Sequence, residues 1–551
     1  MNKKWWKEAV VYQIYPRSFM NSNGDGIGDL QGIISKLDYL KELGIDVIWL
    51  SPIYKSPDHD NGYDISDYYD IMPELGTIED FDELLAGAHQ RGMKVIMDLV
   101  VNHTSDEHSW FVESRSSENN PKRDFYIWHK GSNGKEPNNW AADFGGSAWN
   151  KDEKTVEYYL HLFSKHQPDL NWENPELRKA IYAMMRWWLD KGIDGFRMDV
   201  INFLAKAPEF PDAPVIDPDR PGDYVHGGAL YANQPGIHDH LQEMNREVLS
   251  HYDIMTIGEC HFMSPQEGRL YADESRHELD MVFQYDIIHS GGDLETLKKR
   301  VHAWHQEFKG KAWNTINLNN HDTARQVSHF GDDKAYRIES AKLLATFVLT
   351  APGTPYLYQG EEIGMTNANF PHIEHYRDIK MLNGHEELLE SGKRPEEALS
   401  ELQLHSRDNG RTPMQWDNSQ HAGFTQGTPW IGVNPNFKSI NVADAEKDRN
   451  SVLHFYQRMI KFRKKNEALI YGDYIPLNND ESPIYAYKRA SNNVVFLIVL
   501  NFSSEARVFV LPLEMREKTL ELLLSNYRTL SGEDKGELAL NAWEARIYDV
   551  R

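Results

Sequence analysis

Three segments of the chain share one pattern, in which an amphipathic helix ends at a glycine and a short apolar run follows. The glycines and the runs that follow them are Gly44 with residues 45–50, Gly92 with residues 93–98, and Gly192 with residues 193–199. Each run is too continuously apolar for a strand that has one face in water. The repeat therefore predicts parallel β-strands connected by helices.

Five further apolar runs bring the number of expected strands to eight. They cover residues 9–15, 254–258, 279–285, 313–318 and 354–358. Eight parallel strands that alternate with helices are the parts of a closed (β/α)8 barrel, in which the chemistry lies at the carboxyl ends of the strands. The sequence therefore predicts an α/β fold of the TIM-barrel type.

Three regions depart from this alternation. Residues 104–174 are rich in Asn, Trp, Gly and Pro, which predicts an inserted subdomain after strand 3, and a long loop insertion is expected at about 365–430. Beyond residue 480, short alternating strands predict an antiparallel β-sandwich. The expected domains are the catalytic barrel at 1–103 and 175–479, the inserted subdomain at 104–174, and the C-terminal β domain at 480–551.

The composition narrows the possible partners. Among 551 residues, 84 are acidic and 59 basic, and this net charge of −25 argues against a nucleic-acid binder. The longest apolar run, residues 494–500, is too short to span a bilayer, and residues 1–8 contain no apolar core of a secretory signal. The single cysteine, Cys260, excludes an internal disulfide and fits a reducing compartment. We expect a cytoplasmic monomer that binds neither nucleic acid nor membranes.

Charged side chains gather where predicted strands end, at Asp98, Arg197, Asp199, Glu259 and Asp322. Any one of them could cap a helix or pair with a neighbouring arginine, but their gathering at one edge favours chemistry. Two carboxylates that flank a bond are the usual machinery of glycoside hydrolysis. Arg197 should lower the pKa of Asp199 and keep this nucleophile ionised. Desolvation after the apolar run should raise the pKa of Glu259 and keep this acid protonated.

The same residues lie in four ordered motifs, which are residues 98–103, 195–200, 258–259 and 320–322. They resemble the four successive motifs of the α-amylase-type glycoside hydrolases. From residue 5 into the C-terminal β domain, the chain resembles the branch that contains oligo-1,6-glucosidases (isomaltases), dextran glucosidases, α-glucosidases and sucrose isomerases. Residues 24–30, 59–64, 358–367 and 411–416 support this resemblance.

The resemblance implies a role for each matching residue. Asp199 would be the nucleophile, Glu259 the acid/base and Asp322 the third carboxylate, which grips sugar hydroxyls. The implied substrate-binding residues are His103 and His321 at the glucose hydroxyls, Arg197 beside Asp199, Asp60 and Arg407 at the non-reducing end, Tyr63 under the ring, and Phe144, Phe163 and Gln167 in the wall. A pocket closed at one end implies exo action. For the histidines, a purely structural hydrogen bond is the alternative.

Val200 bears on the linkage, because in the resembling group a valine directly after the nucleophile accompanies α-1,6 cleavage. The expected function is a retaining exo-acting α-glucosidase that releases α-glucose from isomaltose and isomalto-oligosaccharides through a covalent intermediate. An α-1,4-preferring or transglucosylating enzyme is one alternative, since residues 260–262 and 323–324 depart from the family pattern. Sucrose isomerase is another, although residues 287–293 lack the arginine-rich loop of those enzymes. A non-catalytic transporter subunit would be expected to carry a membrane helix and eroded carboxylates.

Residues 21–29 match a calcium loop, with side-chain oxygens at alternating positions and a glycine at the sixth. The twelfth position is Gly32 instead of a bidentate glutamate, and a turn without metal is the alternative. Relatives carry Ca²⁺ here, often with Asp in place of Asn21. The implied ligands of a structural Ca²⁺ are Asn21, Asn23, Asp25, Ile27 and Asp29. No catalytic cofactor is expected.

Overall fold

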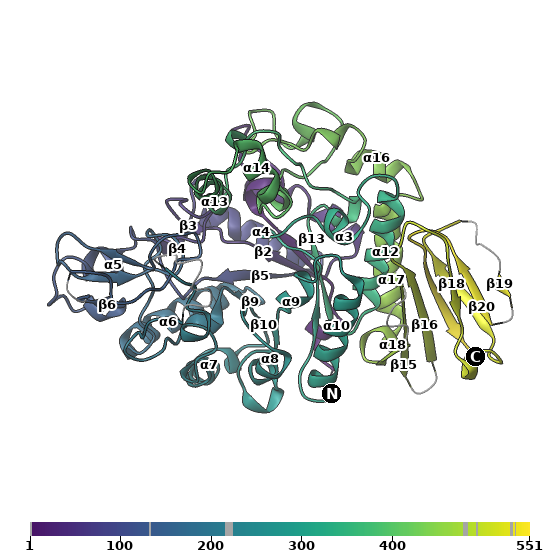
Figure 1. The fold of residues 1–551 in the computed structure, drawn as a ribbon, viewed down its shortest axis with the longest axis horizontal. Helices are drawn as coiled ribbons and strands as arrows, with labels where there is room; N and C mark the ends of the chain where they lie inside the picture. The colour runs from purple at the N-terminus through teal and green to yellow at the C-terminus, as the bar shows by residue number, and fades with distance from the viewer. Residues whose placement is uncertain are drawn as a thin grey trace.

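The computed structural model describes residues 3–131, 134–214, 224–477, 483–491, 494–528, 533–534 and 536–551. Eight parallel strands form one sheet at its centre (Figure 1). In sheet order they are β11 (Met281–Val282), β10 (Met255–Gly258), β9 (Gly195–Met198), β5 (Lys94–Leu99), β2 (Val47–Leu50), β1 (Val11–Ile14), β13 (Thr354–Tyr358) and β12 (Thr315–Ile316).

The two end strands of this sheet approach each other, so that the barrel is nearly closed. Thr315 Oγ1 in β12 donates a hydrogen bond to the carbonyl of Val282 in β11 at 3.0 Å. Every predicted apolar run overlaps one of the eight strands. The predicted TIM-barrel class is therefore confirmed.

Helices cover the outside of the barrel, and their ends follow the expected chemistry. The Asn174 side chain caps α6 (Pro175–Lys191), and α6 ends at Gly192 with φ 111°, a conformation that glycine adopts without strain. The other covering helices include α3 (Leu37–Leu43), α4 (Ile78–Gln90), α7 (Gly236–Glu247), α8 (Pro265–Ala272), α10 (Leu294–Phe308) and α12 (Arg337–Thr350). None of the helices in these described residues is long and apolar enough to cross a membrane.

The inserted subdomain follows β5 and lies at one end of the molecule (Figure 1). It contains α5 (Ser109–Ser114) and an antiparallel sheet in the order β6 (Trp128–His129), β8 (Tyr158–Leu160) and β7 (Trp149–Lys151). A segment after β9 packs on it, because Trp140 Nε1 donates to the carbonyl of Pro211 at 2.9 Å. The hydrophobic pattern of the sequence gives no sign of this contact.

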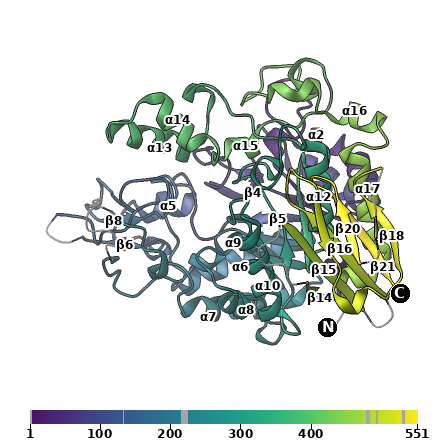
Figure 2. The ribbon, with the colours of Figure 1, turned by 45° about the vertical axis from the view of Figure 1, so that its right-hand side comes forward.

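A helical pair, α13 (Ile379–Glu390) and α14 (Pro395–Gln403), belongs to the loop after β13 and lies beside the inserted subdomain in Figure 2. Two contacts connect the two insertions. Lys380 pairs with Asp143 at 2.9 Å, and Asn383 Nδ2 donates to the carbonyl of Phe144 at 2.7 Å. The mouth of the barrel is therefore bordered by both insertions.

The C-terminal region is an antiparallel β domain of two sheets, as the predicted fold class requires. One sheet has the order β14 (Asp473–Pro476), β15 (Ile484–Ser491), β16 (Val494–Asn501), β21 (Ala545–Val550) and β18 (Leu520–Ser525). The other has the order β17 (Arg507–Val510), β20 (Glu537–Leu540) and β19 (Glu533–Asp534). Helices α12 and α17 (Val452–Lys465) lie between this domain and the barrel (Figure 1), which is why residues 340–350 of α12 are buried all round.

Candidate active site

One guanidinium connects three carboxylates at the carboxyl ends of β5, β9 and β10. Arg197 pairs with Asp98, with Asp199 Oδ1 at 2.7 Å, and with Glu259 Oε2 at 2.7 Å. Asp98 and Arg197 are direct neighbours in the register of β5 and β9, and Asp199 follows on the same side of its strand. The strand register therefore brings these charges together, and Arg197 itself is fully buried.

The Glu259 carboxylate has more donors around it than the Asp199 carboxylate. Its Oε2 accepts from the backbone N–H of Val200 at 3.1 Å, and its Oε1 accepts from the hydroxyl of Tyr285. His261 Nε2 lies 3.6 Å from the same Oε1 atom. Val200 adopts φ 34°, an unusual value for a β-branched residue, and this turn aims its N–H at Glu259.

These contacts reverse the pKa order expected from the sequence. Burial, followed by the nearby Glu259 carboxylate, raises the pKa of Asp199 well above its usual range. Burial would also raise the pKa of Glu259, but Arg197 and then His261 outweigh it and lower that pKa well below the usual range. The expected directions, a lowered pKa for Asp199 and a raised one for Glu259, are both reversed, because a second nitrogen of Arg197 contacts Glu259.

The third predicted carboxylate, Asp322, lies beside two arginines and a histidine. Arg411 Nη2 is 2.6 Å from its Oδ1 atom, Arg407 Nη1 is 3.5 Å from the same atom, and His321 Nε2 is 3.2 Å from Oδ2. Burial opposes ionisation of Asp322, but His321 and Arg407 outweigh it and hold the pKa below its usual range. Asp322 is therefore an ionised acceptor.

Loops close one end of the cavity. Gln167 Nε2 donates to Asp60 Oδ2 at 3.0 Å, and Arg407 lies 3.6 Å from Asp60 Oδ1 and 2.5 Å from Asp378. Asp60 Oδ1 is buried and accepts no hydrogen bond from any residue that the structure describes. Burial raises the pKa of Asp60 to about 7, although Arg407 opposes the shift. A buried acceptor that lacks a donor is suited to a sugar hydroxyl.

The cavity walls combine aromatic rings and histidines. The Tyr63 ring stacks on His321, with centroids 5.4 Å apart, and its hydroxyl lies 2.7 Å from His321 Nε2. His103 Nε2 contacts the carbonyl of Tyr63 at 3.1 Å, and the His103 ring lies 5.1 Å from the ring of Phe163. The rings of Phe144 and Phe163 lie 5.9 Å apart. The walls thus offer both flat apolar faces and polar edges, which a pyranose ring also presents.

Most of the predicted site residues face one cavity of about 250 Å³. Those that line it are Asp60, Tyr63, His103, Phe144, Phe163, Asp199, Val200, Glu259, Asp322 and Arg407. Gln167, Arg197 and His321 do not line it but lie directly behind, bonded to Asp60, Asp199 and Tyr63 respectively. The structure therefore brings all thirteen residues to one place.

Several residues of the site were not identified from the sequence. Tyr285 ends a predicted apolar run, and that position was a usable signal for its contact with Glu259. His261 and Phe262, noted only as departures from the family pattern, line the open side of the cavity together with His289. Asp378, which holds Arg407, lies in an insertion and carries no local signal.

The predicted calcium loop places its oxygens around one side-chain nitrogen. Asn21 Nδ2 donates to Asn23 Oδ1 at 2.9 Å, Asp25 Oδ1 at 3.0 Å, the Ile27 carbonyl at 2.6 Å and Asp29 Oδ2 at 3.3 Å. An amide NH₂ has only two hydrogens, so it cannot satisfy four acceptors at once. These four oxygens fit a hard cation, whereas Asn21 directs its oxygen away, accepting from Gly24 N at 2.9 Å.

Comparisons with known proteins agree with this geometry. The family described as "Alpha amylase, catalytic domain" matches residues 13–472. The chain is 57% identical to an oligo-1,6-glucosidase of Parageobacillus thermoglucosidasius and 53% identical to one of Bacillus cereus, with 100% of each chain covered. The solved isomaltulose synthase SmuA of Protaminobacter rubrum superposes with a TM-score of 0.96 at 43% identity, again over 100% of both chains. Because the family match covers most of the chain and these relatives span its full length, the protein belongs to the alpha-amylase family of glycoside hydrolases.

Proposed function

We propose that this protein is a retaining exo-acting α-glucosidase that cleaves α-1,6 bonds at the non-reducing ends of isomaltose and isomalto-oligosaccharides. One observation carries the proposal. The guanidinium of Arg197 holds the Asp199 and Glu259 carboxylates together, below a cavity whose far end is closed by Asp60 and Arg407. Closely spaced carboxylates favour the retaining mechanism, and a closed end favours removal of one terminal unit.

The mechanism assigns one bond change to each carboxylate. Asp199 attacks the anomeric carbon while Glu259 protonates the departing glycosidic oxygen, and a covalent glucosyl ester forms on Asp199. Glu259 then removes a proton from a water molecule that hydrolyses the ester and restores the α-anomer. This step requires an ionised Asp199 and a protonated Glu259, whereas the contacts within the protein raise the pKa of Asp199 and lower that of Glu259. A glycosidic oxygen placed beside Glu259 would favour its protonated form.

The α-1,6 preference is supported by Val200 and by the relatives. Val200 lines the cavity directly after Asp199 in the chain, and its backbone N–H donates to Glu259 Oε2 at 3.1 Å. Two full-length relatives are named oligo-1,6-glucosidases. An α-1,4-preferring or transglucosylating enzyme is the nearest alternative within the same mechanism.

Sucrose isomerisation is the second candidate, because several of the solved structures most similar to this chain are isomaltulose synthases. Residues 287–293, at the end of α9 (Tyr285–Ile288), contain no arginine. Among them, His289 reaches the cavity. A loop without an arginine or lysine offers little to hold a fructosyl leaving group for rearrangement, which favours hydrolysis.

Product analysis tests the proposal. The purified enzyme is supplied separately with isomaltose, maltose, sucrose, trehalose and panose, and early products are followed by NMR. We expect isomaltose to have the highest kcat/KM and α-glucose to appear first. The first appearance of β-glucose would exclude retention, and isomaltulose formed from sucrose would favour the isomerase.

We further propose that Asn23, Asp25, Ile27 and Asp29 hold a structural Ca²⁺. The support is the convergence of their oxygens on Asn21 Nδ2. Such an ion would neutralise the two carboxylates of the loop and fix the turn that leads into α2 (Leu30–Ile34). It would contribute stability and take no part in the reaction.

We also propose that the protein is a cytoplasmic monomer. Its one cysteine, Cys260, is free and buried. The fold therefore does not depend on a disulfide, which is compatible with a reducing compartment. Sedimentation of the purified chain tests the monomer, and fractionation of the producing cells tests the compartment.

A further inference from the structure

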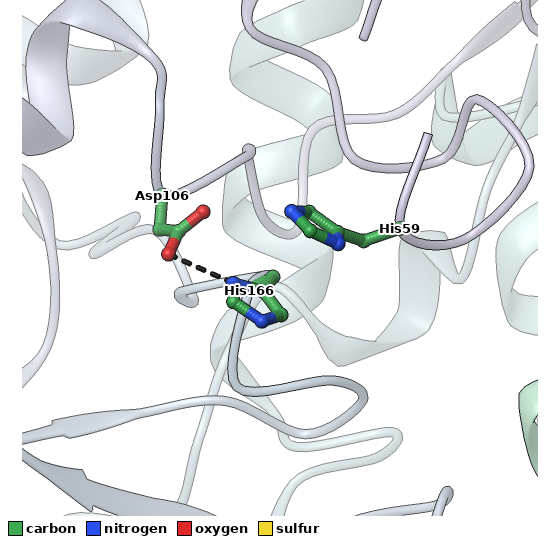
Figure 3. Close-up of side chains that lie close together, drawn as sticks. All are labelled: His59, Asp106 and His166. Atoms are coloured by element: carbon green, nitrogen blue, oxygen red, sulfur yellow. Dashed lines mark hydrogen bonds and ion pairs between the residues drawn. The ribbon is translucent and has the colours of Figure 1, made fainter. Parts of the chain in front are cut away.

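Two histidines and an aspartate converge at the surface behind the closed end of the cavity. His59, Asp106 and His166 come from three separate segments, and Figure 3 shows their side chains directed toward one another. Each contributes a potential ligand atom, and these atoms all lie within 4.8 Å of one another. None of the three lines the active-site cavity.

The arrangement is fixed by both side-chain and backbone contacts. His166 Nδ1 lies 3.0 Å from Asp106 Oδ2, and the backbone N–H of Asp106 donates to the His166 carbonyl at 3.0 Å. The rings of His59 and His166 stack with centroids 3.9 Å apart. The loop that carries His59 is anchored, because its backbone N–H donates to the buried Asp64 carboxylate at 2.8 Å. Little rearrangement of the backbone is therefore needed to bring three ligands onto one ion.

The second oxygen of Asp106 points to a missing partner. Asp106 Oδ1 is buried and accepts no hydrogen bond from the described part of the chain. In Figure 3 this oxygen is directed toward the His59 ring. A buried carboxylate oxygen without a donor is costly unless a proton donor, a water molecule or a cation meets it.

We propose that His59, Asp106 and His166 bind a divalent transition-metal ion of the zinc type. Two imidazole nitrogens and one carboxylate oxygen are ligands that Zn²⁺ accepts, whereas Ca²⁺ and Mg²⁺ prefer oxygen alone. The ion would replace the proton between His166 Nδ1 and Asp106, and rotation of the His59 ring would complete the set. His166 and Asp106 keep 32% and 20% of their side chains exposed, so an ion can enter from solvent and water can fill the remaining coordination position.

The location gives the site a consequence for the enzyme. His59 directly precedes Asp60, and His166 directly precedes Gln167, whose amide donates to Asp60 at 3.0 Å. An ion shared by His59 and His166 would hold together the two loops that close the sugar pocket. The metal site and the proposed hydrolytic function are nevertheless independent, since binding can be measured without substrate.

Metal titration of the full chain tests the proposal. Chelator-treated wild type, His166→Ala and Asp106→Asn are titrated with Zn²⁺ in competition with a chromophoric zinc indicator. His375→Ala is the matched control, since it removes an exposed histidine from another close pair, His372 with His375. Circular dichroism and thermal unfolding without metal confirm that each variant is folded.

We expect the wild type and His375→Ala to bind one tight equivalent that both cluster variants lose. Because loss of even an outer-shell partner weakens metal sites by roughly 10–100-fold, loss of a direct ligand should weaken this one by at least about tenfold. Zn²⁺ should also raise the unfolding temperature of the wild type and not that of His166→Ala. The same stoichiometry and affinity in wild type and both cluster variants would overturn the proposal, and so would the absence of any tight equivalent in the wild type.

Discussion

The cavity has a floor, formed by Asp199 and Glu259 around Arg197, and a closed end, formed by Asp60, Gln167 and Arg407. These two regions are built from different kinds of segment. Asp199 and Glu259 follow adjacent barrel strands, and the register of those strands sets their spacing. Asp60, Gln167 and Arg407 instead come from three loops that meet through side-chain contacts. The chemistry therefore rests on the most rigid part of the fold, while recognition of the terminal sugar rests on the part that can vary between relatives.

The two regions also differ in how their charges are satisfied. On the floor, Arg197 is fully buried and contacts three carboxylates. If one carboxylate is removed, the other two still neutralise the buried guanidinium. At the closed end, Asp60 keeps one oxygen without a described donor and a pKa near 7. On the floor every carboxylate has a partner within the protein, although Arg197 Nε makes no hydrogen bond with the described residues. At the closed end, one acceptor oxygen of Asp60 is left for substrate.

Replacing the proposed nucleophile should give the largest effect. Asp199→Asn keeps the size of the side chain but removes the charge that attacks the anomeric carbon. We expect kcat/KM on isomaltose to fall by roughly 10⁴-fold or more, as for other residues that act directly on the reacting bond. Steady-state assays measure the fall, and mass spectrometry of the quenched enzyme should detect no glucosyl ester.

Circular dichroism serves as the control that the Asp199→Asn variant is folded. Asp199→Asn should retain the wild-type circular dichroism spectrum, because Arg197 still has Asp98 and Glu259 as partners. A folded Asp199→Asn enzyme with near-wild-type activity would remove Asp199 from the mechanism.

Removing the cation at the closed end should give a smaller and different effect. Arg407→Ala leaves Asp60 and Asp378 without their shared partner. We expect kcat/KM to fall by roughly 10²–10³-fold, mainly through a higher KM, because the loss concerns binding of the terminal glucose and not bond cleavage. Steady-state kinetics on isomaltose separate the two parameters.

Arg394→Ala is the matched control for Arg407→Ala. Its side chain is 74% exposed and pairs with Glu397 at the start of α14, away from the cavity. It should leave both kinetic parameters unchanged. If Arg407→Ala lowered kcat as strongly as Asp199→Asn, the distinction between floor and closed end would be lost.

The same contrast explains how much could be read from the sequence. Eight apolar runs predicted eight strands, because buried parallel strands need continuous apolar residues. Asp98, Arg197, Asp199 and Glu259 could be placed together, because barrel geometry brings strand ends to one mouth. The fold and the floor were therefore accessible to reasoning from local pattern.

The closed end was accessible only through resemblance, and parts of it not at all. Asp378 reaches Arg407 from an insertion whose path no local pattern determines. The pKa order of Asp199 and Glu259 was also out of reach, because it depends on the contact of Arg197 with Glu259 and then on His261, which only the folded chain supplies.

The pH dependence of substrate binding should follow the ionisation of Asp60 at the closed end. Because burial raises the pKa of Asp60 to about 7, this carboxyl is mostly protonated at pH 6 and mostly ionised at pH 8. Only the ionised form accepts sugar hydroxyls on both oxygens. We therefore expect KM for isomaltose to fall by up to about tenfold from pH 6 to pH 8, with a flat profile in Asp60→Asn.

The stability of the free enzyme should change with the opposite sign. A folded-state pKa above the unfolded value of 3.8 means that the favourable contribution of Asp60 is full below that value and is lost as pH rises through about 7. Asp60→Asn should therefore gain in unfolding temperature relative to wild type at pH 8 more than at pH 5. Parallel pH profiles for the two proteins would contradict this role of Asp60.

Replacing Val200, which lines the cavity beside the floor, tests what determines the preference for α-1,6 over α-1,4 bonds. Val200→Thr preserves shape and β-branching, so the backbone at φ 34° is affected little. The change adds a hydroxyl to the cavity lining next to both carboxylates, and we expect the kcat/KM ratio of isomaltose to maltose to fall by about 3–10-fold. Using a ratio cancels any general loss of activity. Ile201→Val, at a neighbouring buried position outside the cavity lining, should leave the ratio unchanged.

The smallest effect is expected at the predicted calcium loop, residues 21–29, none of which lines the cavity. Asn21→Asp replaces an amide that faces four oxygens with a carboxylate, which repels Asp25 and Asp29 unless a cation is present. Calorimetry with Ca²⁺ and with chelator should therefore differ by about 2–4 °C more in Asn21→Asp than in wild type. Asn119→Asp adds the same charge at an exposed position and should show no such dependence. Identical curves for Asn21→Asp under both conditions would show that the loop needs no metal, and the Asn21 amide would then be the group that holds it closed.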